Sequence, residues 1–325
     1  MASQMLVISE EEINSNISLS DVINVVEESF KAYALGKTIL PPKYHYFMPW
    51  GILGLIPAYV ETMDALAVKI AQGRKENPEK GLPAGIYQIL LFDPETARPL
   101  AFMNGSLATA LRTAAAAAIG AKYMARSDSK RLGVIGTGIV GRTSVKMMNQ
   151  LFELEEVYAA DISESSKEGF VQELKDLYSL KIAKVSFEEA TCNSDILVTA
   201  TPSKEPLIKR GWIPKGLHIS AMGADNPGKQ ELDPAILKDA KIICDSIDQC
   251  LEFGELNVPH SSGLLDDKDI IGEIGELVSG RKRVRTNRHA ITVFDSTGMG
   301  IQDAAIAKLI YDVALEKGFG RLVEI

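Results

Sequence analysis

The glycine-rich segment Gly136-Thr-Gly-Ile-Val-Gly141 constrains the fold of this chain more than any other feature. It follows the short apolar run Leu132–Ile135 and opens a helical pattern that continues to about Phe152. Asp161 ends the next apolar run, at about the 20-residue separation at which dinucleotide-binding units carry an acidic residue for the ribose. A strand, a glycine-rich turn, a helix and a well-spaced acid together predict a dinucleotide-binding unit.

The three glycines of this segment have separate physical roles in such a turn. Gly136 permits the tight bend, Gly138 lets the backbone approach a pyrophosphate, and Gly141 lets the helix pack closely on the strand. The first turn of the helix then presents free N–H groups to the phosphates. The Asp161 carboxylate is suited to accept hydrogen bonds from both ribose hydroxyls and would repel a 2′-phosphate. The pattern favours NAD(H) over NADP(H); the alternative is a glycine-rich turn that only packs a core.

Short apolar runs alternate with helical patterns around this turn. The runs that we interpret as strands are Leu132–Gly136, Glu156–Asp161, Lys181–Val185, Asp195–Ala200, Leu217–Ala221, Lys241–Asp245 and Ile291–Asp295. Helical patterns cover residues 140–152 and 165–178, and Ser186 and Glu189 have the spacing of a capping box. This alternation predicts an α/β fold, with a parallel sheet between helices and a Rossmann domain over residues 128–298.

Residues 1–127 have a different pattern and predict a mixed α+β domain for substrate binding and dimerisation. An amphipathic helical pattern covers residues 17–35 and ends at Gly36. Four runs with strand character follow, separated by Gly, Pro and Asn as in an antiparallel sheet: Gly54–Val60, Ala65–Ala71, Gly85–Phe92 and Arg98–Met103. We expect the helix within residues 299–325 to pack back on this first domain. A length of 325 residues fits two domains of roughly 150 residues each.

Composition excludes several classes of function. A net charge of −8 disfavours nucleic-acid binding, and the basic run from Gly280 to Arg285 is interpreted as a solvated loop. No apolar run reaches the ~18 residues that span a bilayer, and the first residues lack a signal-peptide pattern, so we expect no membrane partner. Three widely spaced cysteines predict reduced thiols in a cytoplasmic protein, and four scattered histidines predict no metal site.

Two cations stand out in otherwise apolar surroundings. Lys69 lies in the run Ala65–Ala71, where a lysine either extends to the surface, or holds a substrate carboxylate or assists proton transfer. Arg112 lies in an alanine-rich helix start, where it is either a surface residue or a guanidinium fork for a carboxylate or phosphate. The sequence leaves both alternatives open for each residue.

Asp225 is the candidate acid/base group. It follows the predicted strand Leu217–Ala221, and ligands of open α/β sheets bind outside the carboxyl ends of strands. Asp225 is therefore expected to meet the nicotinamide end of the cofactor. The alternative is a turn cap before Pro227.

These segments together resemble the ornithine cyclodeaminase/μ-crystallin family, in order and over essentially the whole chain. The closest likeness is to its archaeal-type alanine dehydrogenase branch, especially in Tyr33–Lys37 and Asn77–Pro83. The other matching pieces are Leu40–Lys43, Ile56–Tyr59, Lys69, Gly81–Pro83, Leu111–Thr113, the glycine motif, Gly223–Asp225, Pro227–Leu232, Gly254–Leu256, Thr292–Gly298 and Ile301–Asp303.

The resemblance implies a homodimeric NAD-dependent oxidoreductase that acts on amino or imino acids. Matched residue by residue, it implies that Lys43, Lys69 and Arg112 contact the substrate carboxylate, and that Lys69 and Asp225 are the catalytic pair, with Asp225 as acid/base at the substrate nitrogen. The residues it implies for the dinucleotide are Thr109, Arg112, Gly136, Thr137, Gly138, Ile139, Val140, Gly141, Asp161, Ser296 and Gly298.

One position departs from the family pattern. Before Leu55-Ile56-Pro57, cyclodeaminases carry glutamate and the alanine dehydrogenase branch carries arginine, whereas this chain has Gly54. Either the glycine leaves open space at this position, or another group, such as Arg74 or His45, supplies the charge there. The expected activity is reduction of the C=N bond of a small 2-imino acid. The alternatives are a cyclodeaminase-type lyase that recycles NAD, and a ligand-binding protein like μ-crystallin.

Overall fold

The computed structural model describes residues 4–175 and 180–325 and divides into two compact units. Unit 1 comprises Met1–Arg112 with Met299–Ile325, and unit 2 comprises Thr113–Gly298. The division falls inside helix α3 (Gly105–Met124), whereas the boundary expected from the sequence lies after that helix, at residues 127 and 128. Because α3 is one unbroken alanine-rich helix, its sequence contains no turn signal that would mark the division.

Unit 1 contains an eight-stranded sheet with the order β16-β1-β7-β6-β5-β4-β2, in which β3 also pairs with β4. The strands are β1 (Gln4–Ile8), β2 (Thr38–Ile39), β3 (Tyr44–Met48), β4 (Gly51–Val60), β5 (Ala65–Gly73), β6 (Gly85–Phe92), β7 (Pro99–Asn104) and β16 (Arg321–Glu324). The antiparallel order predicted for β4 to β7 is confirmed. Strand β1, which was not predicted from the sequence, joins this sheet parallel to β7.

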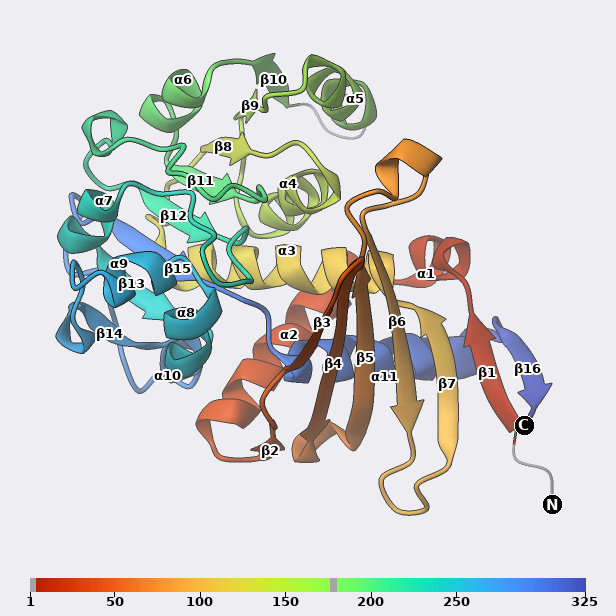
Figure 1. Ribbon diagram of the computed structural model, residues 1–325. Helices are drawn as coiled ribbons and strands as arrows, with labels where there is room; N and C mark the ends of the chain where they lie inside the picture. The colour runs from red at the N-terminus through yellow and green to blue at the C-terminus, as the bar shows by residue number, and fades with distance from the viewer. Residues whose placement is uncertain (1–3, 176–179) are drawn as a thin grey trace. The chain divides into compact units, whose positions relative to one another are not determined.

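Alternation along the strands gives this sheet one buried face. Helices α11 (Gly300–Lys317) and α2 (Leu19–Ala34) cover that face, and α11 contacts β4, β5, β6 and β7 (Figure 1). The first residue of α11, Gly300, allows a close approach, because a Cβ there would lie 3.0 Å from the Ala58 Cβ. Helix α11 thus lies against strands from the first part of the chain. The short helices of the unit are α1 (Glu10–Asn16), η1 (Glu61–Met63) and η2 (Pro78–Lys80).

Unit 2 contains an eight-stranded sheet with the order β10-β9-β8-β11-β12-β15-β13-β14, and every pair in it is parallel. Its strands are β8 (Arg131–Ile135), β9 (Glu156–Ala160), β10 (Lys181–Lys184), β11 (Ile196–Thr199), β12 (His218–Ala221), β13 (Lys241–Cys244), β14 (Ile270–Glu273) and β15 (Thr292–Asp295). The strand order reverses at β8 and β11, which makes this sheet a Rossmann sheet with a ligand-binding switch point. The predicted fold class is confirmed.

Helices connect these strands. They are α4 (Ile139–Leu151), α5 (Glu164–Leu174), α6 (Phe187–Cys192), η3 (Arg210–Trp212), α7 (Pro234–Asp239), α8 (Ile247–Phe253), α9 (Asn257–Ser261), η4 (Asp267–Asp269) and α10 (Ile274–Val278). The capping box predicted at Ser186 and Glu189 is present. The last residues of the helix predicted over 165–178 lie outside the described residues. Within residues 4–175 and 180–325, no helix has the length and apolarity that crossing a membrane requires.

Candidate active site

The glycine-rich loop joins β8 to α4 at the switch point of the unit 2 sheet. Gly136 has φ +99°, a conformation that residues with a side chain rarely adopt. A Cβ on Gly141 would lie 2.1 Å from the Gly136 carbonyl oxygen, so only glycine lets the helix approach the strand this closely. A Cβ on Gly138 would meet nothing within 4 Å. The first and third glycines are thus required by packing, and the second has open space above it.

The start of α4 has the features of a phosphate-binding helix terminus. Gly138 is the N-cap and supplies no side-chain cap, so the N–H groups of the first turn point into the open space above the loop. Ile139 is exposed and Val140 is half-buried, while Thr137 is fully buried beneath them. These residues fit a dinucleotide pyrophosphate, because the uncapped donors and the missing Cβ leave both the hydrogen bonds and the room for it.

Asp161 lies in the turn after β9 and faces this loop. Its Oδ2 accepts hydrogen bonds from the Thr137 amide at 2.8 Å and from the Thr137 hydroxyl at 3.0 Å, and its Oδ1 accepts from the Ser163 amide at 2.9 Å. A carboxylate has about four lone-pair positions, so Oδ1 retains one for a ribose hydroxyl. A second ribose hydroxyl would take the place of the Thr137 hydroxyl on Oδ2.

Ser296 and Gly298 follow β15 and are both tied to Asp245, at the end of β13. The Ser296 hydroxyl and the Gly298 amide each donate to Asp245 Oδ2 at 2.8 Å. Gly298 has φ +75°, so glycine suits the bend that follows. All strands of this sheet are parallel, so the glycine-rich loop, the Asp225 loop and the Ser296–Gly298 turn share one edge of it.

Further carboxylates lie buried under this edge. Glu231 accepts from the Thr201 and Gly223 amides, Glu255 accepts from the Glu231 and Leu232 amides, and Asp295 accepts from the Glu255 and Leu256 amides. Burial raises the pKa of Asp295 to about 8, and burial together with the charge of Glu231 raises the pKa of Glu255 well above its usual range.

These buried acids act as a scaffold for the loops after β11, β12, β13 and β15, because each one binds backbone N–H groups from another loop. No role was predicted for them from the sequence. The signal was present, since Glu231 and Glu255 each lie in a segment that carries the family resemblance. Among the residues that the structure describes, no group of His, Cys, Asp and Glu side chains has an arrangement that would hold a metal ion.

In unit 1, Lys69 is buried in an ion pair. Its Nζ lies 2.7 Å from Asp303 Oδ2, and the side chain is only 4% exposed, so the alternative of a lysine extending to the surface is wrong. Burial, the charge of Arg112 and the charge of Lys43 together lower the pKa of Lys69 to about 8, and the charge and hydrogen bond of Asp303 oppose them. Its proton is therefore held weakly enough to titrate near neutral pH.

Arg112 shares the same carboxylate. Its Nε lies 2.9 Å from Asp303 Oδ1, and its Nη1 donates to Gln302 Oε1 at 3.3 Å. The side chain is 8% exposed, so the alternative of a surface arginine is also wrong. Thr109 lies one turn earlier on α3 and is half-buried. Asp303 and Gln302 are the site residues that the sequence analysis missed, although an aspartate within the apolar helical run Gly300–Ala307 signals a buried partner.

The face of the unit 1 sheet that carries Lys69 continues towards β3, where it carries Lys43, His45 and Gly54. His45 pairs with Gly54, and Gly54 pairs with Ala71, two residues beyond Lys69. A Cβ on Gly54 would lie 3.2 Å from the His45 Cδ2, so the imidazole lies over the space that a side chain at position 54 would use. Arg74, the other candidate for a charge role, lies with its guanidinium carbon 6.0 Å from the centre of the Trp50 ring.

Asp225 lies in the turn after β12, and its side chain is 49% exposed. Its Oδ1 accepts from Lys229 Nζ at 2.5 Å and from Asn226 Nδ2 at 2.8 Å. The turn itself is closed by the Lys229 amide donating to the Asn226 carbonyl at 3.2 Å, and the Gly228 amide donates to Asn257 Oδ1. A backbone hydrogen bond and the Asn257 side chain therefore support this turn in addition to the contacts of Asp225.

Comparisons with known proteins agree with this architecture over nearly the whole chain. An alanine dehydrogenase from Archaeoglobus fulgidus is 40% identical over 321 residues, which are 99% of this chain and 98% of that protein. Among solved structures, an archaeal alanine dehydrogenase dimer with bound NAD matches with a TM-score of 0.95 and 41% identity, covering 99% of each chain.

A second solved structure matches equally well in fold. The Thermococcus litoralis Delta(1)-pyrroline-2-carboxylate reductase, in complex with NADH and L-proline, has a TM-score of 0.95 and 37% identity and covers 98% of this chain and 99% of that chain. The sequence profile of the ornithine cyclodeaminase/mu-crystallin family matches residues 3–318. The chain belongs to the ornithine cyclodeaminase/mu-crystallin family.

Proposed function

We propose that this chain is an NAD(H)-dependent imino acid reductase or amino acid dehydrogenase, which reduces the C=N bond of a small 2-imino acid to the L-amino acid. The observation that carries the proposal is the buried group of Lys69, Arg112 and Asp303, where two cations face one carboxylate. A buried surplus of positive charge is costly unless an anion completes it. A substrate carboxylate is such an anion.

Relatives named as amino acid dehydrogenases and relatives named as imine reductases both support this class of reaction. The chain is an NAD-dependent oxidoreductase of the group that contains alanine dehydrogenases and Delta(1)-pyrroline-2-carboxylate reductases. Those two names describe the interconversion of an amino acid with a C=N or C=O compound. We propose that this chain catalyses the same type of reaction with a small 2-imino acid as its substrate.

Each unit supplies a part of the proposed reaction. In unit 1, Lys43, Lys69 and Arg112 hold the substrate carboxylate by charge and hydrogen bonds. In unit 2, the glycine-rich loop and Asp161 bind the dinucleotide, whose nicotinamide ring supplies the hydride when bound. Asp225 stabilises the positive charge of the iminium nitrogen and supplies or takes its proton. Positioning and preorganised charge provide most of the acceleration in such a site.

The test is a panel of 2-oxo acids with ammonia or methylamine, and of cyclic ketimines, followed by the loss of NADH absorbance. Net NADH consumption with formation of an amino acid is the expected result. Release of ammonia from ornithine without net NADH change would instead identify a cyclodeaminase. Saturable binding of small molecules with no turnover on the whole panel would leave only a binding function.

Cofactor preference gives a specific prediction. We expect NAD(H) to bind much more tightly than NADP(H), because a 2′-phosphate would meet the Asp161 carboxylate. Ile162, the next residue, is 92% exposed and is a suitable position for a new cation. The double variant Asp161→Ser/Ile162→Arg should lose that preference, whereas Ile162→Arg alone should keep it. Fluorescence titration with NADH and NADPH measures both affinities, and equal affinities in the unmodified protein would contradict the assignment.

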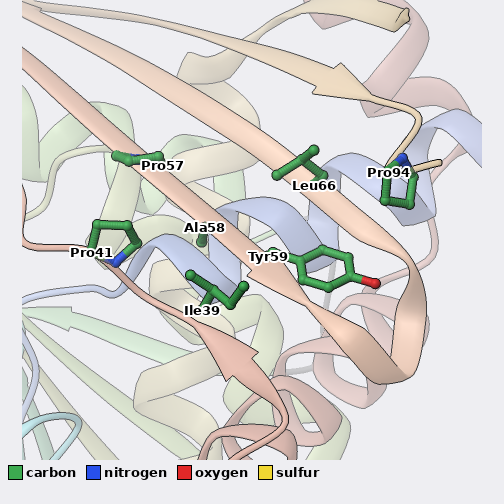
Figure 2. Close-up of a pocket in the computed structure, with 7 residues that line it drawn as sticks. All are labelled: Ile39, Pro41, Pro57, Ala58, Tyr59, Leu66 and Pro94. Atoms are coloured by element: carbon green, nitrogen blue, oxygen red, sulfur yellow. The ribbon is translucent and has the colours of Figure 1, made fainter. Parts of the chain in front are cut away.

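We also infer that unit 1 forms a homodimer through the second face of its sheet. Pro57, Val68, Leu90 and Phe102 form one row across β4, β5, β6 and β7 on that face, and all four are half-buried. Beside this row, Figure 2 shows an apolar hollow lined by Ile39, Pro41, Pro57, Ala58, Tyr59, Leu66 and Pro94. A contiguous apolar face of this kind is typical of a subunit interface.

A charge in this row should therefore prevent dimerisation. We expect the unmodified protein to be a dimer at micromolar concentration, and Leu90→Glu to be a folded monomer. Leu315→Glu is the matched control, because Leu315 is a single exposed leucine on α11 (59% exposed). Multi-angle light scattering measures the mass of each variant. A monomeric parent protein, or a dimeric Leu90→Glu variant, would argue against this interface.

A further inference from the structure

Asp303 contacts two buried cations of unit 1, Lys69 and Arg112. Its side chain is 2% exposed, and its two oxygens bind different partners: Oδ2 lies 2.7 Å from Lys69 Nζ, and Oδ1 lies 2.9 Å from Arg112 Nε. The two cations come from a strand and a helix that are far apart in the sequence. One side chain thus fixes the separation and the direction of both.

Local structure holds Asp303 itself in place. It lies in the first turn of α11, where the positive end of the helix dipole favours a carboxylate. Gly300 lets that turn approach β4, whose Ile56 is the neighbour of Lys69 in the sheet. The adjacent Gln302 binds the Nη1 of Arg112, so α11 supplies both groups that orient the guanidinium.

The charges of this group do not balance. Lys69 and Arg112 are two cations against one carboxylate, and Lys43 adds a further positive charge that acts on Lys69. Burial opposes the ionisation of Asp303, but the charges and hydrogen bonds of Arg112 and Lys69 outweigh it and hold the pKa of Asp303 below its usual value. Asp303 is therefore ionised, and one positive charge of the buried group Lys69, Arg112 and Asp303 remains for a ligand; Lys43 is only half-buried and is not counted in this group.

We propose that Asp303 is the positioning residue of the carboxylate-binding site: it holds Lys69 and Arg112 side by side and leaves the pair with a single surplus positive charge that matches one substrate carboxylate. This inference rests on the proposed function and deepens it, because it assigns the site to monoanionic carboxylate groups. Asp303 does not touch the substrate; it acts through the two cations.

A consequence is that carboxylate binding depends on pH. Lys69 binds a carboxylate well only when protonated, so affinity should be constant below pH 8 and fall above it, since the pKa of Lys69 is about 8. In Asp303→Asn the counter-charge that raises the pKa of Lys69 is lost. The fall in affinity should then begin at a lower pH. At pH 7.5 the dissociation constant should rise about threefold for the first unit by which the pKa of Lys69 drops from about 8, and towards tenfold for each further unit.

The experiment is calorimetric titration of the NADH-loaded protein with pyruvate, without ammonia, from pH 6 to 9.5. Pyruvate has no group that titrates in this range, and the assay needs no turnover. Asp303→Glu keeps the charge but shifts it by one methylene, so it should bind more weakly with an unchanged pH midpoint. Asp312→Asn, which removes an exposed carboxylate paired with Lys308 on the same helix, should match the parent protein.

Two results would overturn the inference. One is an Asp303→Asn protein with a lower melting temperature but unchanged pyruvate affinity and pH midpoint, which would make Asp303 a purely structural ion partner. The other is an Asp303→Glu protein that binds as tightly as the parent, and this result decides the matter even if Asp303→Asn does not fold. Intact pH-dependent binding without reductase activity on the substrate panel would overturn the proposed function and leave Asp303 in its role.

Discussion

Replacing Lys69 by methionine should lower kcat/KM about 100-fold while leaving the melting temperature unchanged or raised. The variant leaves Arg112 and Asp303 as a balanced pair, so the buried surplus charge disappears and methionine fills the space of the lysine stem. The loss in kcat/KM corresponds to roughly 2.7 kcal/mol, which is typical for removing a buried hydrogen-bonded charge from its partner.

Opposite effects on activity and stability distinguish a substrate-binding lysine from a structural one. A lysine that served only to neutralise Asp303 would leave turnover intact when replaced. Lys37→Met is the matched control, because Lys37 pairs with Glu61 at 2.7 Å in the same unit but is half-exposed. Exposed pairs contribute about 0–1 kcal/mol, so this control should change neither quantity measurably. Full activity in Lys69→Met would remove Lys69 from the carboxylate site.

The strands that were predicted best carry their own sequence signals. Residues 85–92 are apolar with turn signals at both ends, and β6 has those bounds. The segment β8–α4–β9 was predictable because its glycines, apolar runs and Asp161 all lie within one local unit. In contrast, β1 has only five residues, and it is a strand because β7 and β16 pair with it from distant parts of the chain. Local patterns contain no information on such pairing.

The same distinction applies to the candidate site. Composition around Lys69 and Arg112 marked them as unusual, but it did not decide whether they are buried. That decision depends on Asp303, which is 191 residues away from Arg112 in the sequence. The position of the half-buried His45 beside Gly54 likewise depends on the pairing of β3 with β4. Residue types were thus readable from the sequence, and their partners required the fold.

Asp225 differs from these residues because its side chain is 49% exposed and it contacts two near neighbours in sequence, Asn226 and Lys229. Its ion pair with Lys229 joins residues four apart, with side chains 49% and 20% exposed, so the pair contributes little to stability. The turn is closed by backbone hydrogen bonds and by Asn257. An exposed carboxylate at the carboxyl edge of a parallel sheet is suited to chemistry.

The prediction is that Asp225→Asn keeps NADH affinity and melting temperature but lowers kcat by roughly 100-fold or more, the usual contribution of a positioned acid or base. Asparagine preserves the shape and cannot take a proton or stabilise an iminium charge. Single-turnover measurement of the NADH absorbance at saturating substrate reports the rate of the chemical step, and NADH fluorescence reports binding.

Two further variants decide what a loss of turnover means. Asp239→Asn removes a comparable exposed carboxylate, paired with Arg210, and should be silent. Lys229→Met removes the partner of Asp225 but leaves its carboxylate, so turnover should stay near the parent value. If Lys229→Met lost as much activity as Asp225→Asn, the ion pair rather than the carboxylate would be the functional element. Near-normal turnover in Asp225→Asn would exclude Asp225 from the mechanism, because asparagine replaces aspartate well only where the role is to cap a turn.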